Sequence, residues 1–311
     1  MNNDYGFAEK HEAVLCLLDE IDRLCRENGI KYSLHGGTLL GAERNGHLIP
    51  WDDDADISML RSQFKKLKKI IEGDETSLLV IKKSEIAPWL TNISFLKNKT
   101  QKVDVDVFIW DYITDSTVGQ ALKINLLRFL QGMMKKNIVY SEYKGIQRIL
   151  IWAAHCVGLP FSEQTKILWY KKIAKDFLIG KKKYIHRSND AFVGCSYIFD
   201  ADYMKSYSMI RLEEHTYMVA KRYHEFLIRN YGEDYLTPPP EKERRSQHGH
   251  NKGFLPESER GGGFIRRNRC AISSCRGAAS CGHRSLSSVC RPCVAGGCAR
   301  PNRRAAPSDR R

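Results

Sequence analysis

Apolar positions recur along the first half of the chain with two different periods, which predict alternating helices and strands. Residues 8–28 carry apolar side chains at three- and four-residue spacing, as an amphipathic helix does. Residues 54–59 instead alternate acidic or polar with apolar side chains, the period of a half-buried strand. Further helices are predicted at 38–44 and 62–73, and further strands at 30–34, 77–82, 91–97 and 103–109. This pattern predicts an α/β or α+β fold with a small mixed sheet.

The second half of the chain is predicted to be mostly helical. Residues 119–178 are rich in Leu, Ile, Trp and Lys at helical spacing, and a last helix is predicted at 221–231. The apolar run 149–161 is too short to span a membrane. We interpret this run as a buried core helix in preference to a helix lying on a membrane surface. The expected organisation is a catalytic core at 1–118, a helical remainder at 119–250 and a tail.

The tail, residues 251–311, differs in composition from the rest. It holds twelve Arg and one Lys against three acidic side chains, whereas residues 1–250 hold 37 basic and 33 acidic ones. Arg, Gly, Ala, Ser, Pro and Cys replace Lys, Tyr and Trp, which indicates a disordered segment translated out of frame or from unrelated DNA. A disordered basic arm and a metal knuckle are the alternatives. Cys290 and Cys293 form a CxxC without a second pair at zinc spacing, so the zinc signal is weak.

Cellular location and partners follow from charge and cysteine usage. The N-terminus has no signal region, and the four cysteines of residues 1–250 lie in apolar segments, as reduced thiols do. We therefore expect a cytoplasmic protein, with peripheral contact to the inner face of the membrane compatible with the pattern. The net charge of +14 suggests a nucleic-acid-binding protein, but the Arg-rich tail lacks the aromatic side chains that stack on bases. No specific nucleic acid is expected as a partner.

A glycine pair followed by clustered acids is the strongest sign of chemistry. Gly36 and Gly37 follow a predicted strand and precede a predicted helix, where backbone N–H groups can bind a phosphate. Asp54 and Asp56 then share one face of the next strand and can hold one hard cation. A third acid is available from the strand at 103–109. Asp104 and Asp106 both lie on its polar face, so the spacing alone leaves the choice open.

The same stretch resembles the LicD family of choline-phosphate transferases. The residues that carry the resemblance are Gly36, Gly37, Thr38, Leu39, Leu40, Gly41, Arg44, Gly46, Ile49, Pro50, Trp51, Asp52, Asp53, Asp54, Asp56 and Ile57. Three later elements resemble softer motifs of the family: residues 105–111, Leu212–His215 and Tyr231–Pro239. Leu212 departs from the usual Phe, and the closing helix expected after Pro240 is missing.

The resemblance implies a nucleotidyltransferase-like fold and a metal-dependent phosphotransferase. Phosphocholine would pass from CDP-choline, or another alcohol phosphate from its CDP donor, to a hydroxyl of a cell-surface glycan such as lipopolysaccharide, capsule or teichoic acid. Asp54 and Asp56 would hold Mg²⁺ or Mn²⁺, and Asp106 would complete the metal site or take the acceptor proton. Gly36, Gly37 and Thr38 would hold a phosphate.

Other roles and other reactions stay open from the sequence. Arg44 would add charge at the leaving group, or lie on the surface without that role. Trp51 and Trp110 could face a quaternary ammonium, although core packing is the favoured interpretation. The same acid spacing also serves a nucleotidyltransferase that uses an NTP and releases pyrophosphate. A nucleic-acid-binding protein is the alternative of another class.

Overall fold

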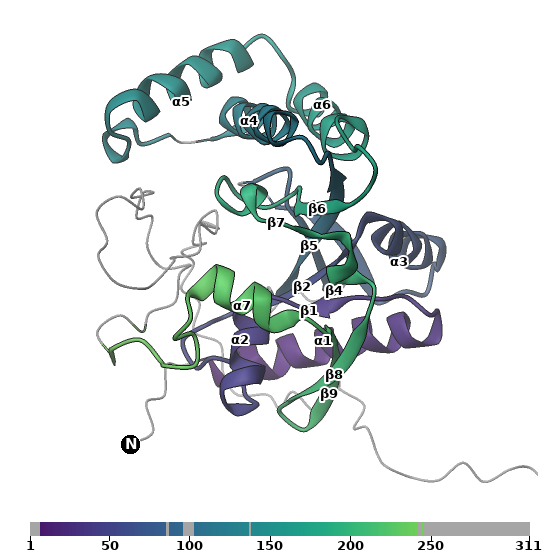
Figure 1. The fold of residues 1–311 in the computed structure, drawn as a ribbon. Helices are drawn as coiled ribbons and strands as arrows, with labels where there is room; N and C mark the ends of the chain where they lie inside the picture. The colour runs from purple at the N-terminus through teal and green to yellow at the C-terminus, as the bar shows by residue number, and fades with distance from the viewer. Residues whose placement is uncertain (1–6, 85–86, 96–102, 137, 242–243, 245–311) are drawn as a thin grey trace, which may run out of the picture. The chain divides into compact units, whose positions relative to one another are not determined.

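A mixed sheet forms the core of the computed structural model, which describes residues 7–84, 87–95, 103–136, 138–241 and 244. The strands are β1 (Ser33–Leu34), β2 (Ala55–Leu60), β3 (Leu79–Lys83), β4 (Thr91–Phe95), β5 (Asp104–Ile113), β6 (Tyr184–Arg187) and β7 (Ile198–Asp200). They follow the order β1–β2–β5–β4–β3, and β6, paired with β7, also pairs with β5. Among the described strand pairs, β2 and β5 run parallel and the others antiparallel (Figure 1).

Seven α-helices accompany the sheet in the described residues, together with a separate hairpin. The helices are α1 (Ala8–Glu27), α2 (Gly36–Asn45), α3 (Arg61–Gly73), α4 (Thr117–Met134), α5 (Gly145–Gly158), α6 (Glu163–Asp176) and α7 (Tyr223–Tyr231), and the hairpin strands are β8 (Tyr207–Leu212) and β9 (His215–Ala220). The apolar face of α1 is buried in one core with β2 and β5. The predicted α/β fold with a small mixed sheet is therefore confirmed. The tail and the predicted division into domains lie partly or wholly outside the described residues and stay predictions.

Two predicted elements differ from the structure near the glycine pair. The strand predicted at 30–34 is shorter, because the Ile30 N–H donates to the Cys25 carbonyl at 2.8 Å and the Lys31 N–H to Gln63 Oε1 at 3.1 Å. These backbone groups are therefore bonded outside the sheet. The helix predicted to begin at residue 38 begins at Gly36, so both glycines lie in its first turn.

The helices of the second half form a cluster of their own, and here one interpretation is wrong. Buried side chains of α4 and α6 pack together with Ala87 and Trp89. By contrast, α5 buries only Ile151, Ala154 and Gly158. The helix is mostly apolar, and because only one face meets α4, the other face is exposed rather than buried as the pattern of residues 149–161 suggested. Within the described residues, no helix combines the length and the apolar character that crossing a membrane requires.

His186 is a fully buried titratable group in β6, beside the centre of the sheet. Its Nδ1 lies 3.0 Å from the Cys195 carbonyl oxygen, which can only accept, so the neutral ring carries its proton there. Burial, followed by the nearby Lys123, lowers the pKa of His186 to about 4. Its ordinary pKa is about 6.5. Between about pH 6.5 and pH 4, His186 is therefore mostly neutral in the folded chain and mostly protonated in the unfolded chain.

Stability should consequently fall as the pH falls from about 6.5 to about 4, with His186 contributing up to about 3 kcal/mol of that loss. Above pH 6.5 this histidine is neutral in both states and adds no pH dependence. A His186→Asn variant keeps a donor to Cys195 but cannot be protonated. Urea unfolding at pH 7.0, 5.5 and 4.5 should show a flatter dependence for the variant than for the parent. Parallel curves for the two proteins would refute this assignment.

Candidate metal centre

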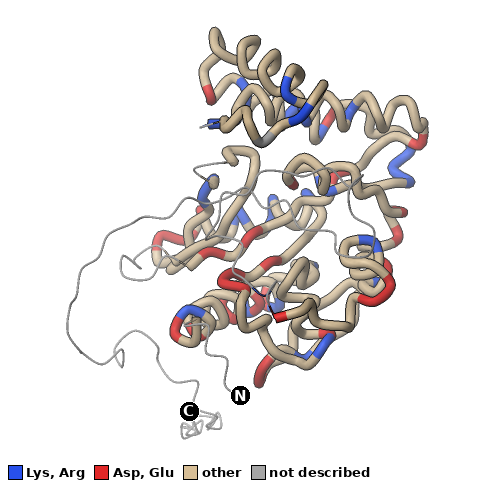
Figure 2. The backbone as a smooth tube through the Cα atoms, turned by 90° about the vertical axis from the view of Figure 1, so that its left-hand side faces the viewer, with Lys and Arg blue, Asp and Glu red and all other residues tan. Residues whose placement is uncertain are grey.

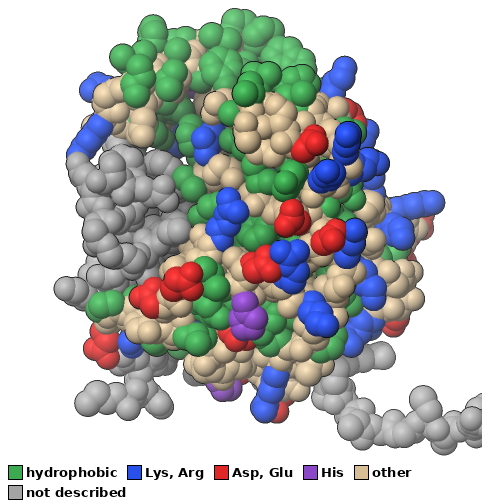
Figure 3. All heavy atoms as spheres, viewed as in Figure 1, with side chains coloured by type: hydrophobic (Ala, Val, Ile, Leu, Met, Phe, Trp, Pro, Cys, Tyr) green, Lys and Arg blue, Asp and Glu red, His purple; other side chains and the backbone are tan. Residues whose placement is uncertain are grey.

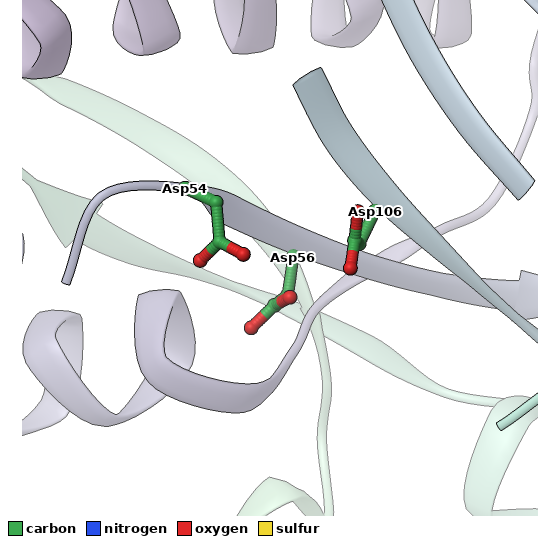
Figure 4. A group of neighbouring side chains, drawn as sticks. All are labelled: Asp54, Asp56 and Asp106. Carbon is green, nitrogen blue, oxygen red and sulfur yellow. The ribbon is translucent and has the colours of Figure 1, made fainter. Parts of the chain in front are cut away.

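Strand register brings three carboxylates together at the centre of the sheet. Asp56 on β2 lies directly beside Asp106 on the parallel strand β5. Asp54 precedes β2 by one residue and shares the face of Asp56, because side chains two apart in a strand point the same way. One carboxylate oxygen from each residue lies within 4.8 Å of the others (Figure 4). This spacing suits oxygen ligands that share one or two cations.

The surroundings make this cluster costly without a positive partner. Asp56 is 0% exposed and Asp106 is 7% exposed, and Asp54 is only partly exposed. Like charges this close disfavour one another, and burial disfavours each charge separately. The donor set consists of carboxylate oxygen alone, which hard cations such as Mg²⁺ and Mn²⁺ prefer over soft metals. The residues present therefore fit a hard divalent cation.

Asp104, the alternative third acid, is not part of the cluster. It lies at the start of β5, opposite Ser94 of β4, and is partly exposed. Asp106, two residues later, lies opposite Asp56 on one side and Asn92 on the other. The structure thus brings Asp106, and not Asp104, to the pair formed by Asp54 and Asp56.

A side chain and a backbone N–H group orient two of the three carboxylates. Asn92 on β4 donates from Nδ2 to Asp106 Oδ1 at 2.8 Å, and both residues are buried. Asn92 was not among the predicted site residues, because Thr91 and Ser94 of the same strand are also polar and nothing in the strand pattern distinguishes Asn92 from them. The Gly37 N–H donates to Asp56 Oδ2 at 3.1 Å, and the Asp56 N–H donates to Thr38 Oγ1 at 2.8 Å.

The glycine pair therefore lies against the acids. Gly36 has a φ of +55°, a region that glycine adopts without steric cost. The turn presents the N-terminus of α2, with its partial positive charge, to the Asp56 carboxylate. The Gly37 N–H, predicted to bind a phosphate, is engaged by Asp56 in this structure. The phosphate-binding role of Gly36, Gly37 and Thr38 stays a prediction.

Arg44 is directed toward the last part of the described chain. Its Nε donates to the Tyr235 carbonyl at 2.7 Å and one Nη donates to the Thr237 carbonyl at 3.1 Å. Burial lowers the pKa of Arg44. Its guanidinium thus connects the end of α2 to the element at 231–239, and its predicted role at the leaving group stays a prediction.

Glu213, in the turn between β8 and β9, holds the loop that leads to the acids. Its Oε1 accepts from the Leu48 N–H at 2.9 Å, and its Oε2 lies 2.7 Å from His47 Nδ1. Its own N–H donates to the Gly46 carbonyl at 2.6 Å. From the sequence, the Leu212–His215 element was known only by its resemblance to a family motif. The structure shows that it braces the loop between α2 and β2.

The two tryptophans occupy different environments. Trp110 on β5 is 0% exposed and packs edge-on against Phe199, with ring centroids 5.5 Å apart. It therefore offers no open ring face, as the core interpretation predicted. Trp51 is partly exposed, and the Arg244 guanidinium lies 5.3 Å from its ring centroid. That ring already receives a cation from the chain itself.

Comparison with known proteins agrees with this geometry. Residues 29–125, which hold the glycine pair and all three acids, match the sequence profile of the family described as "LicD/FKTN/FKRP, nucleotidyltransferase domain". The chain is 26% identical over 266 residues to the lipopolysaccharide cholinephosphotransferase LicD of Haemophilus influenzae, which covers 77% of this chain and 95% of that protein.

Two further proteins are similar to this chain over shorter stretches. The ribitol 5-phosphate transferase FKRP of Homo sapiens is 55% identical over 31 residues, 10% of this chain and 6% of that protein. The uncharacterized protein RP689 of Rickettsia prowazekii is 40% identical over 55 residues, 18% of this chain and 21% of that protein. The resemblance predicted from the motif is thereby confirmed. Residues 29–125 are thus similar to the nucleotidyltransferase domain of the LicD family, and the similarity to one of its members extends over most of this chain.

Proposed function

We propose that this chain is a metal-dependent phosphotransferase that moves an alcohol phosphate from a CDP-activated donor to a hydroxyl of a cell-surface glycan. The observation that carries the proposal is the cluster of Asp54, Asp56 and Asp106, with oxygens within 4.8 Å of one another. The relatives that are named by activity are a lipopolysaccharide cholinephosphotransferase and a ribitol 5-phosphate transferase. Phosphocholine from CDP-choline is the first candidate for the transferred group, and lipopolysaccharide for the acceptor.

The reaction would exchange the phosphoanhydride bond of the donor for a phosphoester bond to the acceptor. The oxygen of the acceptor hydroxyl bonds to the phosphorus that carries the alcohol, and the bond from that phosphorus to the bridging oxygen of the diphosphate breaks. CMP leaves with that oxygen, and the acceptor hydroxyl loses its proton. The transition state spreads negative charge over the phosphoryl oxygens, so catalysis rests on positioning and on nearby positive charge.

Each acid has a defined part in this proposal. Asp54 and Asp56 would hold Mg²⁺ or Mn²⁺, which would neutralise the donor diphosphate and the departing CMP when bound. Asp106 would complete the metal site or accept the acceptor proton, and Asn92 holds one of its oxygens in place for either role. Glu213 supports the loop that carries Asp54, through the contacts at Gly46, His47 and Leu48.

The test compares donors with the full chain and MnCl₂ or MgCl₂. CDP-choline labelled in the choline, CDP-ribitol labelled in the ribitol, and CTP and ATP labelled in the α-phosphate are each incubated with lipopolysaccharide. We expect label from one CDP-alcohol in the lipopolysaccharide and CMP released in equal amount. EDTA should stop the reaction, and Asp54→Asn should not perform it.

The alternative reaction predicts a different set of products. A nucleotidyltransferase would consume CTP or ATP, release pyrophosphate and attach the nucleotide to the acceptor. That result, with CDP-choline and CDP-ribitol both intact, would overturn the proposal while leaving the metal centre in place.

A further inference from the structure

The outer face of α5 is an exposed apolar surface. Ile149, Leu150 and Trp152 are exposed by 60%, 60% and 56%. Of the nineteen large hydrophobic residues exposed in the described part of the chain, fourteen lie between Val118 and Phe177. Figure 3 shows hydrophobic side chains gathered at the top of the view, where Figure 1 places α5. Exposed apolar area concentrated in this way marks a binding surface.

The opposite face of α5 packs against α4. Ile151 and Ala154 are buried there, and a Cβ added to Gly132 of α4 would meet the Ala154 Cβ at 2.8 Å. A Cβ added to Gly158 would meet the Met133 carbonyl oxygen at 2.7 Å. Small residues thus fix how closely the two helices approach. The outer face cannot rotate inward without breaking this packing.

The segment that contains α5 carries an excess of positive charge. Residues 135–183 contain eleven Lys and Arg against three Asp and Glu, while the remainder of residues 1–250 contains 26 basic and 30 acidic side chains. No acidic residue occurs in α5, and Lys144 and Arg148 are exposed beside its apolar side chains. Figure 2 shows Lys and Arg outnumbering Asp and Glu on the helices at the top of the view. The excess of basic over acidic side chains in residues 1–250 therefore comes from this segment.

An anionic lipid surface matches both properties. Apolar side chains of a surface-lying helix enter the boundary between headgroups and acyl chains, and Lys and Arg around them attract anionic headgroups. Trp152 and Trp169 add the aromatic side chains that favour this boundary. The core of a protein–protein interface is also depleted of charged residues, but such an interface does not require that the charged residues around it be mainly basic. With 14 residues, α5 is about 20 Å long, shorter than the roughly 30 Å of a bilayer interior.

We propose that the outer face of α5, with the following segment Leu159–Phe161, lies on the surface of an anionic phospholipid membrane. Leu159 and Phe161 are also exposed, so the apolar surface continues past the end of the helix. The inference rests on this surface alone and holds whether or not the chain performs the proposed transfer. A membrane-anchored glycan acceptor would be brought to the enzyme by such binding.

Vesicle flotation with the full chain tests the proposal. Vesicles of phosphatidylcholine with one quarter phosphatidylglycerol are compared with vesicles of phosphatidylcholine alone. The double variant Ile149→Ser, Trp152→Ser should bind the anionic vesicles at least about tenfold more weakly than the parent. The matched control Leu78→Ser, Met209→Ser changes two exposed apolar residues outside this surface and should bind like the parent. Lys144→Gln, Arg148→Gln should bind more weakly at low salt only.

Two further measurements keep the outcome decisive. The Arg-rich tail can also attract anionic vesicles, so binding is repeated at 0.5 M NaCl, where the apolar difference should persist. Brominated lipids should quench the fluorescence of the parent more than that of the variant that lacks Trp152. Equal flotation of parent and Ile149→Ser, Trp152→Ser would overturn the proposal. The proposal would also be overturned if the parent did not bind vesicles and sedimented as a dimer while the Ile149→Ser, Trp152→Ser variant sedimented as a monomer.

Discussion

Replacing Asp56 with asparagine is expected to lower the transfer rate by about a thousandfold or more while leaving the fold intact. The metal and its ligands stabilise several kcal/mol of transition-state charge, and each 1.36 kcal/mol is a factor of ten in rate. The asparagine keeps an oxygen that can accept from the Gly37 N–H, now 3.1 Å from Asp56 Oδ2. Removing one negative charge from the cluster also relieves repulsion. Without added metal, the variant should melt at the same temperature as the parent or higher.

The control for this experiment lies on the neighbouring strand. Asp104→Asn removes the same charge two residues from Asp106, outside the cluster, and should keep most of the activity. Binding of Mn²⁺ measured by calorimetry gives a readout that does not depend on turnover. It should be lost in Asp56→Asn and in Asp54→Asn, and kept in Asp104→Asn. Full activity in Asp56→Asn would remove the basis of the assigned metal centre.

Asp111→Asn, on the same strand as Asp106, should have the opposite effect. Asp111 is 4% exposed and accepts from Arg61 Nε at 2.6 Å, from Arg61 Nη at 2.5 Å and from Ser188 Oγ at 2.5 Å. Loss of its charge would leave the Arg61 guanidinium, which is 19% exposed, without its ion-pair partner. Breaking such a buried pair costs about 3–5 kcal/mol of unfolding free energy. Activity per folded molecule should be close to that of the parent.

Urea unfolding and the rate per folded molecule together separate the two acids. Asp106→Asn should lose activity with little loss of stability, and Asp111→Asn should lose stability with little loss of activity. The double variant Arg61→Leu, Asp111→Leu should recover part of the lost stability, because apolar residues can replace a buried ion pair. An Asp111→Asn variant that is as stable as the parent but inactive would place Asp111 in the site instead.

The faces on which the acids lie could be predicted from the sequence, because the alternation that determines them is visible within each strand. Alternation between acidic and apolar residues fixed the face of Asp54 and Asp56, and the same period placed Asp106 on the polar face of its strand. The period could not distinguish Asp104 from Asp106, because both lie on that face. That choice depends on the register between β2 and β5, which sequence periodicity does not contain.

Contacts between distant segments were correspondingly harder to predict. Asn92 is a plain polar residue until β4 pairs with β5, and Glu213 is a turn residue until its hairpin meets the loop after α2. The error at α5 has a related cause. An apolar helix has the same pattern whether its outer face is covered by protein or by another apolar surface, so periodicity alone could not show its exposure.

The contacts of Arg44 can form only late in the synthesis of this protein. They join α2 to carbonyls 191 and 193 positions later in the chain, well beyond residues 29–125 that match the family profile. A chain still emerging from the ribosome would have made all three acids long before it made Glu213, Tyr235 or Thr237. The loop beside the acids would therefore receive its last supports only when translation has passed Thr237. A shortened protein meant to keep that loop in place must extend at least as far.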